Sequence, residues 1–335
     1  MEKERIAYFD WIRGLMILWM LVYHISLNYG RITFAVPEDG ASVFTSMSFF
    51  MAPFYVGAGY FFSFKKDFGT FFRNQIKKLF VPYCFFTVFG VVVFESYSLI
   101  VNNCLGGISL IEAIPTGCLR TNTPLWFLFS FFCCRLIYYA INKWAGGGKI
   151  VHLVMVLCFI LAFLTRNQPQ ILGYGNILLG LIFIHLGYCL KQYSNHINKA
   201  WIGACTFVTY LAISYFAPQR MEFVRNILVQ GNYAINILFT VCACLFLWYF
   251  SQRWQHNNLI EKRIVAMGKD SLVVFAFHRP VLNYIIEPIL RYINPTITYY
   301  QFLFLSLITI LILYYFFNLF LKRCCPFVIG LERFN

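Results

Sequence analysis

The feature that most constrains this chain is a succession of apolar segments, most of them long enough to cross a bilayer. A membrane helix needs about 20 consecutive apolar residues, and the bilayer interior leaves only helices and closed barrels as spanning structures. Hydrophobic residues make up 60% of the chain and charged residues only 12%, against roughly 25% charged residues in soluble domains. The sequence therefore predicts an all-α, polytopic integral membrane helical bundle.

About ten transmembrane helices are expected. Their approximate ranges are 6–27, 44–64, 81–101, 124–142, 150–165, 171–190, 200–217, 233–250, 270–287 and 299–321. The first run has no small-residue cleavage site, so it is expected to be retained as a span. No soluble domain or internal repeat separates the segments, so residues 1–335 are expected to form a single transmembrane domain.

The basic residues predict the orientation of the bundle. With a cytoplasmic N-terminus, 18 of the 27 lysines and arginines fall in inside segments, 6 in outside segments and 3 within spans. Every lysine falls inside, which is the bias that cytoplasmic loops show. Both termini are therefore expected in the cytoplasm. The net charge of +14 reflects this bias, and no nucleic-acid partner is expected.

The first span carries ionisable residues on one face. Arg13 and His24 are eleven positions apart, so at about 100° per residue they return to nearly the same face, roughly 16 Å apart along the axis. Asp10 lies three residues before Arg13, at the spacing of an i,i+3 ion pair. Ionisable groups within a membrane are costly and mark functional sites by default. These three residues are therefore the leading candidates for a site.

Two further features suggest where ligands approach. The basic loop 65–80 includes Arg73, Lys77 and Lys78, which either fix the topology or bind the phosphates of a nucleotide-bearing donor. Glu95, in the third span, is expected near the depth of His24. Its carboxylate either orients the imidazole of His24 or reaches water at the outer interface.

The first span also shows a family pattern. From Arg5 to His24 it reads R-x4-D-x2-R-G-x9-H, which resembles the first helix of membrane acyltransferase family 3, the O-acetyltransferase group that includes fucose 4-O-acetylase-like proteins. Residues 124–128 (PLWFL) and 270–280 (DSLVVFAFHRP) are similar to later motifs of the family. The second span departs from the pattern, because Ala58 stands where the family has a serine before Gly59 and Tyr60.

The resemblance implies an enzyme that moves an acyl group, with acetyl as the expected group, from cytoplasmic acyl-coenzyme A to a hydroxyl of a cell-surface sugar, polysaccharide or glycolipid. His24 would be the general base, with a covalent acyl-histidine as the competing variant. Arg13 and the basic loop would hold the donor phosphates, and Asp10 would hold Arg13. His278 would line the substrate cavity or make a structural hydrogen bond. A bacterial inner membrane is implied, and acyl-coenzyme A is a co-substrate and not a bound cofactor.

Other functions stay open at this level. A transporter or flippase for glycans or lipids also has ten spans with intramembrane polar residues, although transporters often show paired interrupted helices in two halves. A structural subunit would leave the polar stripe of the first span unexplained. The sequence leaves the acceptor, the acyl length and the oligomeric state undetermined.

The cysteines and the sixth-span histidine are interpreted as structural. The adjacent pairs Cys133-Cys134 and Cys324-Cys325 lack the C-x2-C spacing of zinc ligands, so no metal is expected. Cys104 and Cys118 lie in one outer loop, where a disulfide is an option. His185 is expected to pack or to hydrogen-bond between helices.

Overall fold

The computed structural model describes residues 7–30, 49–253 and 258–331. The elements are α1 (Ala7–Asn28), α3 (Ala52–Tyr60), α4 (Phe68–Gln75), η1 (Ile76–Phe80), α5 (Val81–Asn102), η2 (Leu110–Ala113), η3 (Arg120–Leu125), α6 (Trp126–Trp144), α7 (Lys149–Leu164), α8 (Tyr174–Gln192), α9 (Ser194–Ile197), α10 (Ala200–Phe216), β1 (Arg220–Glu222), η4 (Phe223–Arg225), β2 (Ile227–Gln230), α11 (Tyr233–Ser251), α12 (Leu259–Lys269), α13 (Ser271–Val281), η5 (Leu282–Ile286), α14 (Glu287–Ile293), α15 (Tyr299–Cys324) and η6 (Pro326–Ile329). The described residues are predominantly helical, as the sequence predicts.

Within the described residues, six helical stretches are long and apolar enough to cross a membrane, which confirms a multi-pass arrangement. They are Phe68–Asn102, Arg120–Trp144, Tyr174–Gln192, Tyr233–Ser251, Ser271–Ile293 and Tyr299–Cys324. Two shorter apolar helices, α7 and α10, match the predicted fifth and seventh spans. The remaining two predicted spans contain α1 and α3. The count of ten and the cytoplasmic termini stay predictions.

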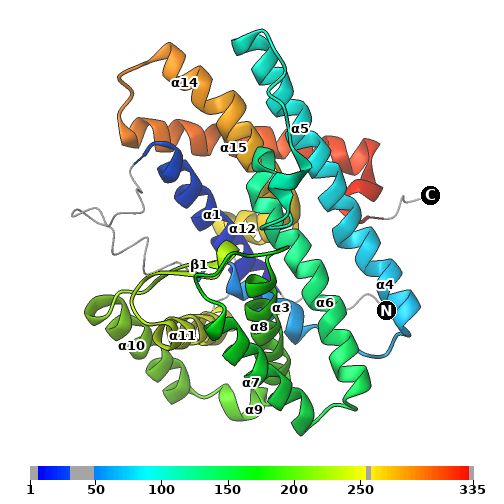
Figure 1. Ribbon diagram of the computed structural model, residues 1–335. Coiled ribbons are helices and arrows are strands. Elements are labelled where there is room, and N and C mark those ends of the chain that lie inside the picture. Colours follow the sequence, from blue (N-terminus) through cyan, green and yellow to red (C-terminus); the bar gives the residue numbers. More distant parts are fainter. Residues whose placement is uncertain (1–6, 31–48, 254–257, 332–335) are drawn as a thin grey trace.

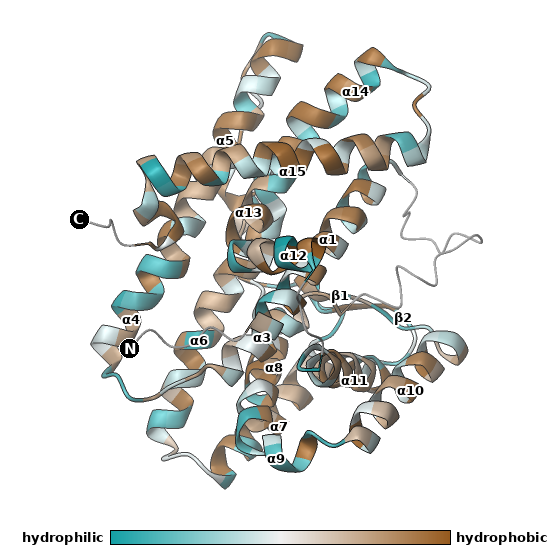
Figure 2. Ribbon diagram, turned by 180° about the vertical axis from the view of Figure 1, so that it is seen from behind, coloured by the Kyte–Doolittle hydropathy of each residue, from teal (hydrophilic) through white to brown (hydrophobic). Residues whose placement is uncertain are grey.

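The helices form two groups, which are joined by the contacts of α3 with both groups and by the contact of α1 with α11. Figures 1 and 2 show α1, α5, α14 and α15 at one end of the molecule and α7, α9, α10 and α11 at the other. A two-stranded antiparallel hairpin, β1–β2, lies between α10 and α11 in sequence, with Arg220 opposite Gln230 and Glu222 opposite Ile227. This hairpin occupies a loop that the sequence places outside.

Glycines allow two close helix crossings. A Cβ at Gly59 of α3 would overlap the backbone oxygen of Ile184 on α8, and one at Gly187 of α8 would overlap that of Val56. A second crossing joins α12 to α1, where a Cβ at Gly268 would overlap the backbone oxygen of Asp10. Small residues at such crossings let membrane helices approach closely. Gly59 and Gly187 thus let α3 and α8 cross closely, and α12 braces the polar part of α1.

Two π-helical turns interrupt the long helices, and each precedes a proline. The turn η1 ends two residues before Pro82, and η5 ends two residues before Pro288. Proline has no N–H, so the carbonyls of Lys78 and Tyr284 lose their α-helical partner. In the π turn the backbone hydrogen bonds join residues five apart instead of four, a change that is frequent at functional sites. It also sets the direction in which Lys77 and Lys78 project from the helix.

The outer surface is apolar where lipid is expected. Large exposed hydrophobic side chains include Val88 of α5, Leu153 of α7, Phe304 and Phe316 of α15, each more than half exposed. Figure 2 shows the corresponding brown colouring along α5 and α15. Such exposure is unusual for a soluble monomer but fits contact with acyl chains.

The thiols of Cys104 and Cys118 are both free, so the optional disulfide is not formed in the structure. Cys104 is exposed, whereas Cys118 is buried and its Sγ lies 3.1 Å from the carbonyl oxygen of Thr123. The sulfhydryl is therefore engaged locally, within the turn that leads into η3.

The exposed cysteines provide a test of the orientation. We expect a variant retaining only Cys104 to react with a membrane-impermeant maleimide in intact cells, because this residue follows α5 in a predicted outside loop. A variant retaining only Cys324, at the end of α15, should react only after permeabilisation. The measurement is gel-shift labelling, and the reverse pattern would show that the bundle has the opposite orientation.

Candidate functional site

Two histidines from distant parts of the chain meet inside the bundle. The ring of His24 on α1 lies 5.1 Å, centroid to centroid, from the ring of His278 on α13, at an interplanar angle of 38°. His278 is completely buried (0% exposed), whereas His24 retains partial exposure. The sequence singled out both residues but did not predict their contact. Helical periodicity fixes a residue's face on its own helix and says little about which helix it meets.

Backbone contacts determine which nitrogen of His278 carries the proton. Its Nδ1 lies 2.8 Å from the carbonyl oxygen of Phe275 and 3.2 Å from that of Val274. Carbonyl oxygens only accept, so Nδ1 must donate, and in the neutral ring Nε2 keeps a lone pair. Among the described residues, Nε2 of His278 and Nδ1 of His24 are both buried without a hydrogen-bond partner. The two neighbouring rings therefore each have a ring nitrogen that is available to exchange a proton with a substrate.

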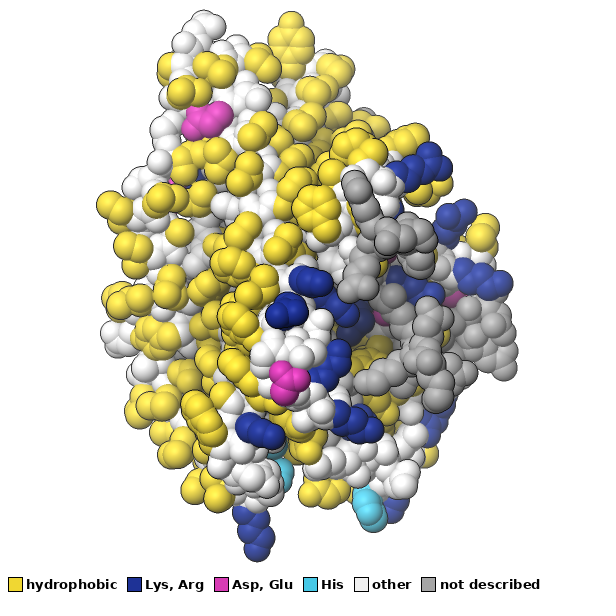
Figure 3. Space-filling model, turned by 90° about the vertical axis from the view of Figure 1, so that its right-hand side faces the viewer, with side chains coloured by type: hydrophobic (Ala, Val, Ile, Leu, Met, Phe, Trp, Pro, Cys, Tyr) yellow, Lys and Arg dark blue, Asp and Glu magenta, His cyan; other side chains and the backbone are white. Residues whose placement is uncertain are grey.

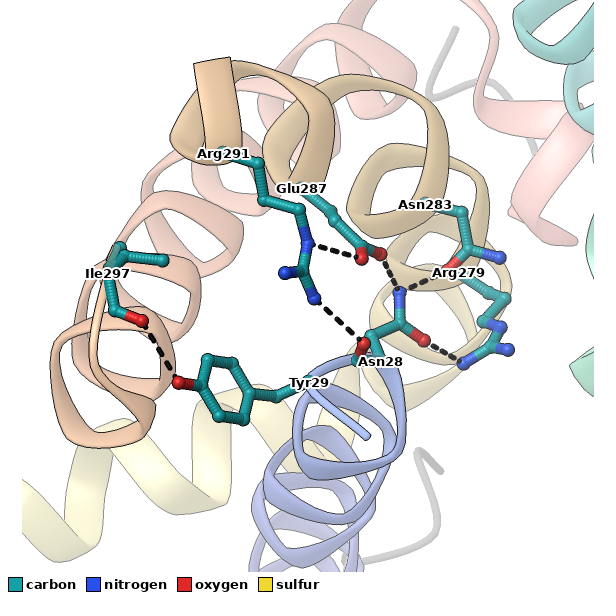
Figure 4. Close-up of polar contacts among 7 residues, drawn as sticks. All are labelled: Asn28, Tyr29, Arg279, Asn283, Glu287, Arg291 and Ile297. Carbon is teal, nitrogen blue, oxygen red and sulfur yellow. Dashed lines mark hydrogen bonds and ion pairs between the residues drawn. The ribbon is translucent and has the colours of Figure 1, made fainter. Parts of the chain in front are cut away.

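A polar cluster holds α1 against α13 and α14 one turn beyond His24. The Asn28 side chain accepts from Arg279 Nη1 (2.7 Å) and donates to Asn283 Oδ1 (2.7 Å) and Glu287 Oε2 (2.8 Å), as Figure 4 shows. Arg291 donates to Glu287 at 2.9 Å and to the carbonyl of Asn28 at 3.3 Å. Both amide donors and the amide oxygen of Asn28 are used. We interpret Asn28 as the brace that brings the two histidine helices together.

This cluster was missed in the sequence. Asn28 lies four residues after His24, so it continues the same helical face by one turn. Extending the polar stripe from Asp10 through His24 by that turn would have found it. Glu287 lies nine residues after His278 and next to a proline, where sequence spacing gives no comparable signal.

At the other end of α1, Asp10 and Arg13 form the expected ion pair. Arg13 Nη1 lies 3.3 Å from Asp10 Oδ1, with exposed fractions of 24% and 1% for the two side chains. The Nη2 atom of Arg13 lies against Gly57 of α3, where a Cβ would be 3.3 Å away. The predicted i,i+3 geometry is therefore confirmed. Arg5, the first residue of the motif, lies outside the described residues.

A second arginine lies near Arg13. The guanidinium of Arg135, on α6, lies over the rings of Phe62, Phe131 and Phe71 at 5.3, 5.8 and 5.9 Å. Arg13 is close enough to exert an electrostatic effect on it. Among the described residues, no carboxylate pairs with Arg135 and its Nε has no hydrogen-bond partner. Two like charges held together favour an anionic ligand between them.

The basic loop residues lie on the surface. Arg73, at the end of α4, and Lys77 and Lys78, in η1, are all exposed. Figure 3, which looks onto the side of the molecule that carries α4, shows dark blue basic side chains grouped around a small polar area. No described contact links these three residues to His24. The structure therefore shows these three residues as exposed and does not bring them into contact with the histidine pair.

Glu95 does not orient His24 through any described contact. Its Oε2 accepts the backbone N–H of Gly106 at 2.7 Å, which ties the end of α5 to the following loop. This arrangement matches the outer-interface alternative. His185 is buried and its ring nitrogens form hydrogen bonds with Tyr138 and His152 on neighbouring helices. This agrees with the prediction that His185 hydrogen-bonds between helices.

Asp270, the first residue of the late motif, makes a structural contact. Its Oδ2 accepts from Lys322 Nζ at 2.6 Å and from Asn318 Nδ2 at 2.9 Å, both on α15. Asp270 directly precedes α13 and lies eight residues before His278, so the contact anchors the start of this helix. It therefore helps to fix the register of the helix that presents this histidine.

A comparison with protein families gives one match over nearly the whole chain. The family model described as an acyltransferase domain, of acyltransferase family 3, matches residues 6–317. The matched region includes Asp10, Arg13, His24 and His278. No curated protein and no solved structure matches the chain.

Proposed function

The chain belongs to acyltransferase family 3, and on this premise we propose that it moves an acyl group, acetyl in the simplest case, from cytoplasmic acyl-coenzyme A to a hydroxyl of a cell-surface sugar, polysaccharide or glycolipid. The contact between His24 and His278 is the observation that carries the proposal. Acyl transfer to a hydroxyl needs a group that removes the hydroxyl proton, and histidine suits that task near neutral pH.

In this mechanism His24 is the general base. The acceptor oxygen attacks the thioester carbonyl carbon while His24 takes the hydroxyl proton. The tetrahedral intermediate then collapses, the C–S bond breaks, and the coenzyme A thiolate recovers the proton from the imidazolium. His278, which is held in one tautomer by its backbone contacts, presents Nε2 as an acceptor that aligns the hydroxyl or His24. An acyl-histidine intermediate is the variant in which His24 itself attacks first.

The donor end of the proposal rests on the cations near the cytoplasmic mouth. Arg13 and Arg135 lie close together, and Arg73, Lys77 and Lys78 are exposed on the adjoining segment. Arginine and lysine bind phosphate oxygens through charge-assisted hydrogen bonds. We therefore assign the phosphates of the donor to these residues, with Asp10 positioning Arg13 through its ion pair. The pantetheine arm would carry the thioester toward His24.

The test is to incubate the purified full-length protein with radiolabelled acetyl-coenzyme A and a panel of glycan acceptors. We expect saturable binding, slow hydrolysis without acceptor, and transfer of label with the correct acceptor. A protein that neither binds nor turns over any acyl-coenzyme A would overturn the proposal. Glycolipid movement in reconstituted vesicles would then be measured, because that result would favour a transporter or flippase.

Replacing Arg13 with Ala should weaken use of the donor. Hydrogen bonds to charged groups contribute about 1.5–3 kcal/mol, which corresponds to roughly 10- to 100-fold in donor KM. The measurement is the dependence of the initial rate on acyl-coenzyme A concentration. The matched control is Arg225→Ala, which removes an exposed arginine from η4. A donor KM that is the same in both variants would show that the phosphates bind elsewhere.

A further inference from the structure

Three metal-ligand side chains converge away from the histidine pair. His152 lies near the start of α7, and His185 and Cys189 lie one turn apart near the end of α8. Their donor atoms all lie within 4.8 Å of one another. His185 is buried, Cys189 is partly exposed and His152 is exposed. The group is therefore anchored on one side by a buried histidine and exposed at the protein surface on the other.

The distance between His185 and Cys189 suits a tetrahedral ion, whereas the exposed ring of His152 has to move to join them. With Zn–N near 2.0–2.1 Å and Zn–S near 2.3 Å, tetrahedral angles place two nitrogens about 3.4 Å apart and a nitrogen and sulfur about 3.6 Å apart. Cys189 Sγ lies 3.6 Å from His185 Nε2. His152 Nδ1 lies 2.8 Å from the same nitrogen, so this exposed ring must move outward by roughly half an ångström.

A neighbouring tyrosine completes the arrangement. Tyr138 Oη, on α6, lies 3.0 Å from His185 Nδ1. When Nε2 of a histidine binds a metal, Nδ1 carries the proton and donates it to an outer partner, which fixes the ring and raises its basicity. Tyr138 is buried, so its hydroxyl is held in place to accept that bond. A hydrogen bond between two histidines explains the 2.8 Å contact alone but not the thiol directed at the same nitrogen.

We propose that His152, His185 and Cys189 form a Zn²⁺ site with water in the fourth position. The imidazole and thiolate set suits zinc and disfavours magnesium or calcium, which prefer oxygen ligands. Binding releases the Cys189 thiol proton to solvent, and the proton of His152 moves from Nδ1 to Nε2. The ion would join α7 to α8. Through Tyr138 it would also be coupled to α6, whose Tyr139 donates to the carbonyl of Lys66 in the segment before α4.

The experiment uses the full-length protein in detergent, stripped with a chelator and dialysed against Zn²⁺ alone. We expect elemental analysis to find a single bound zinc per chain. Substitution with Co²⁺ should give a thiolate-to-cobalt charge-transfer band together with the visible bands of a tetrahedral ion. Tyr138→Phe should weaken zinc binding about 10- to 100-fold, as loss of an outer-shell partner does.

Matched variants decide the assignment. His152→Ala and Cys189→Ser should lose the zinc, and Cys189→Ser should also lose the charge-transfer band. His196→Ala and Cys205→Ser remove an exposed histidine and an exposed cysteine elsewhere and should keep both signals. Because His152 is exposed, its truncation should leave the fold intact, as size-exclusion and circular dichroism would report. A stripped protein that takes up no zinc, or a Cys189→Ser protein that keeps the thiolate band, would overturn the proposal.

Discussion

Replacing His24 with Ala is expected to reduce acyl transfer about 10²- to 10⁴-fold, the range that general acid–base groups contribute. The loss should appear in kcat with little change in donor KM, because His24 acts on the reacting hydroxyl and the donor phosphates are assigned to Arg13. His24→Gln, which keeps a polar side chain but cannot accept the proton at neutral pH, should be about equally inactive.

The double variant separates the roles of the two histidines. If His24 and His278 act as one unit, the His24→Ala/His278→Ala protein should be no slower than the worse single variant. The control His196→Ala changes an exposed histidine on α9 and should retain full activity. Wild-type turnover by a folded His24→Ala protein would contradict the general-base assignment. If His278→Ala lost activity while His24→Ala kept it, the role of general base would pass to His278, whose Nε2 already carries the lone pair.

Periodicity and composition predicted the parts of the structure that depend on one helix at a time. The Asp10–Arg13 ion pair follows from i,i+3 spacing and is present as expected. Long apolar runs likewise predicted the helices around α5, α6, α8, α11, α13 and α15, because length and hydrophobicity alone determine whether a helix can span.

Contacts between helices could not be predicted from the sequence. His24 and His278 were each identified, but 254 positions separate them in the chain and their contact depends on the crossing of α1 with α13. The amphipathic helix α12 was taken for part of an inside loop, since its eleven residues are too short and too charged to read as a span. His152, the proposed zinc ligand, was not identified for the same reason. Its 33-residue separation from His185 matches no motif, and the packing of α7 on α8 brings the two rings together.

The packing of α12 on α1 leads to the second large effect. Replacing Gly268 with Ala is expected to destabilise the protein by about 1–3 kcal/mol or more, the usual cost of overpacking a close contact. The new Cβ would overlap the backbone oxygen of Asp10 and approach the backbone nitrogen of Gly14. Backbone atoms inside a helix cannot rotate away, so the two helices must separate. Because Arg13 lies within this stretch of α1, donor use should fall together with stability.

The measurement is thermal unfolding of the detergent-solubilised variants, followed by intrinsic fluorescence, with the donor KM determined at a temperature where both remain folded. Gly57→Ala is the matched control for the unfolding temperature, since the atoms nearest to its Cβ would be side-chain atoms of Arg13 and Phe9, at 3.3 Å or beyond. Side-chain ends can shift, so this variant should unfold near the wild-type temperature. Equal unfolding temperatures for Gly268→Ala and wild type would show that α12 does not cross α1 at this glycine. In that case the position of Arg13 would depend on its ion pair with Asp10 and its contact with α3 rather than on α12.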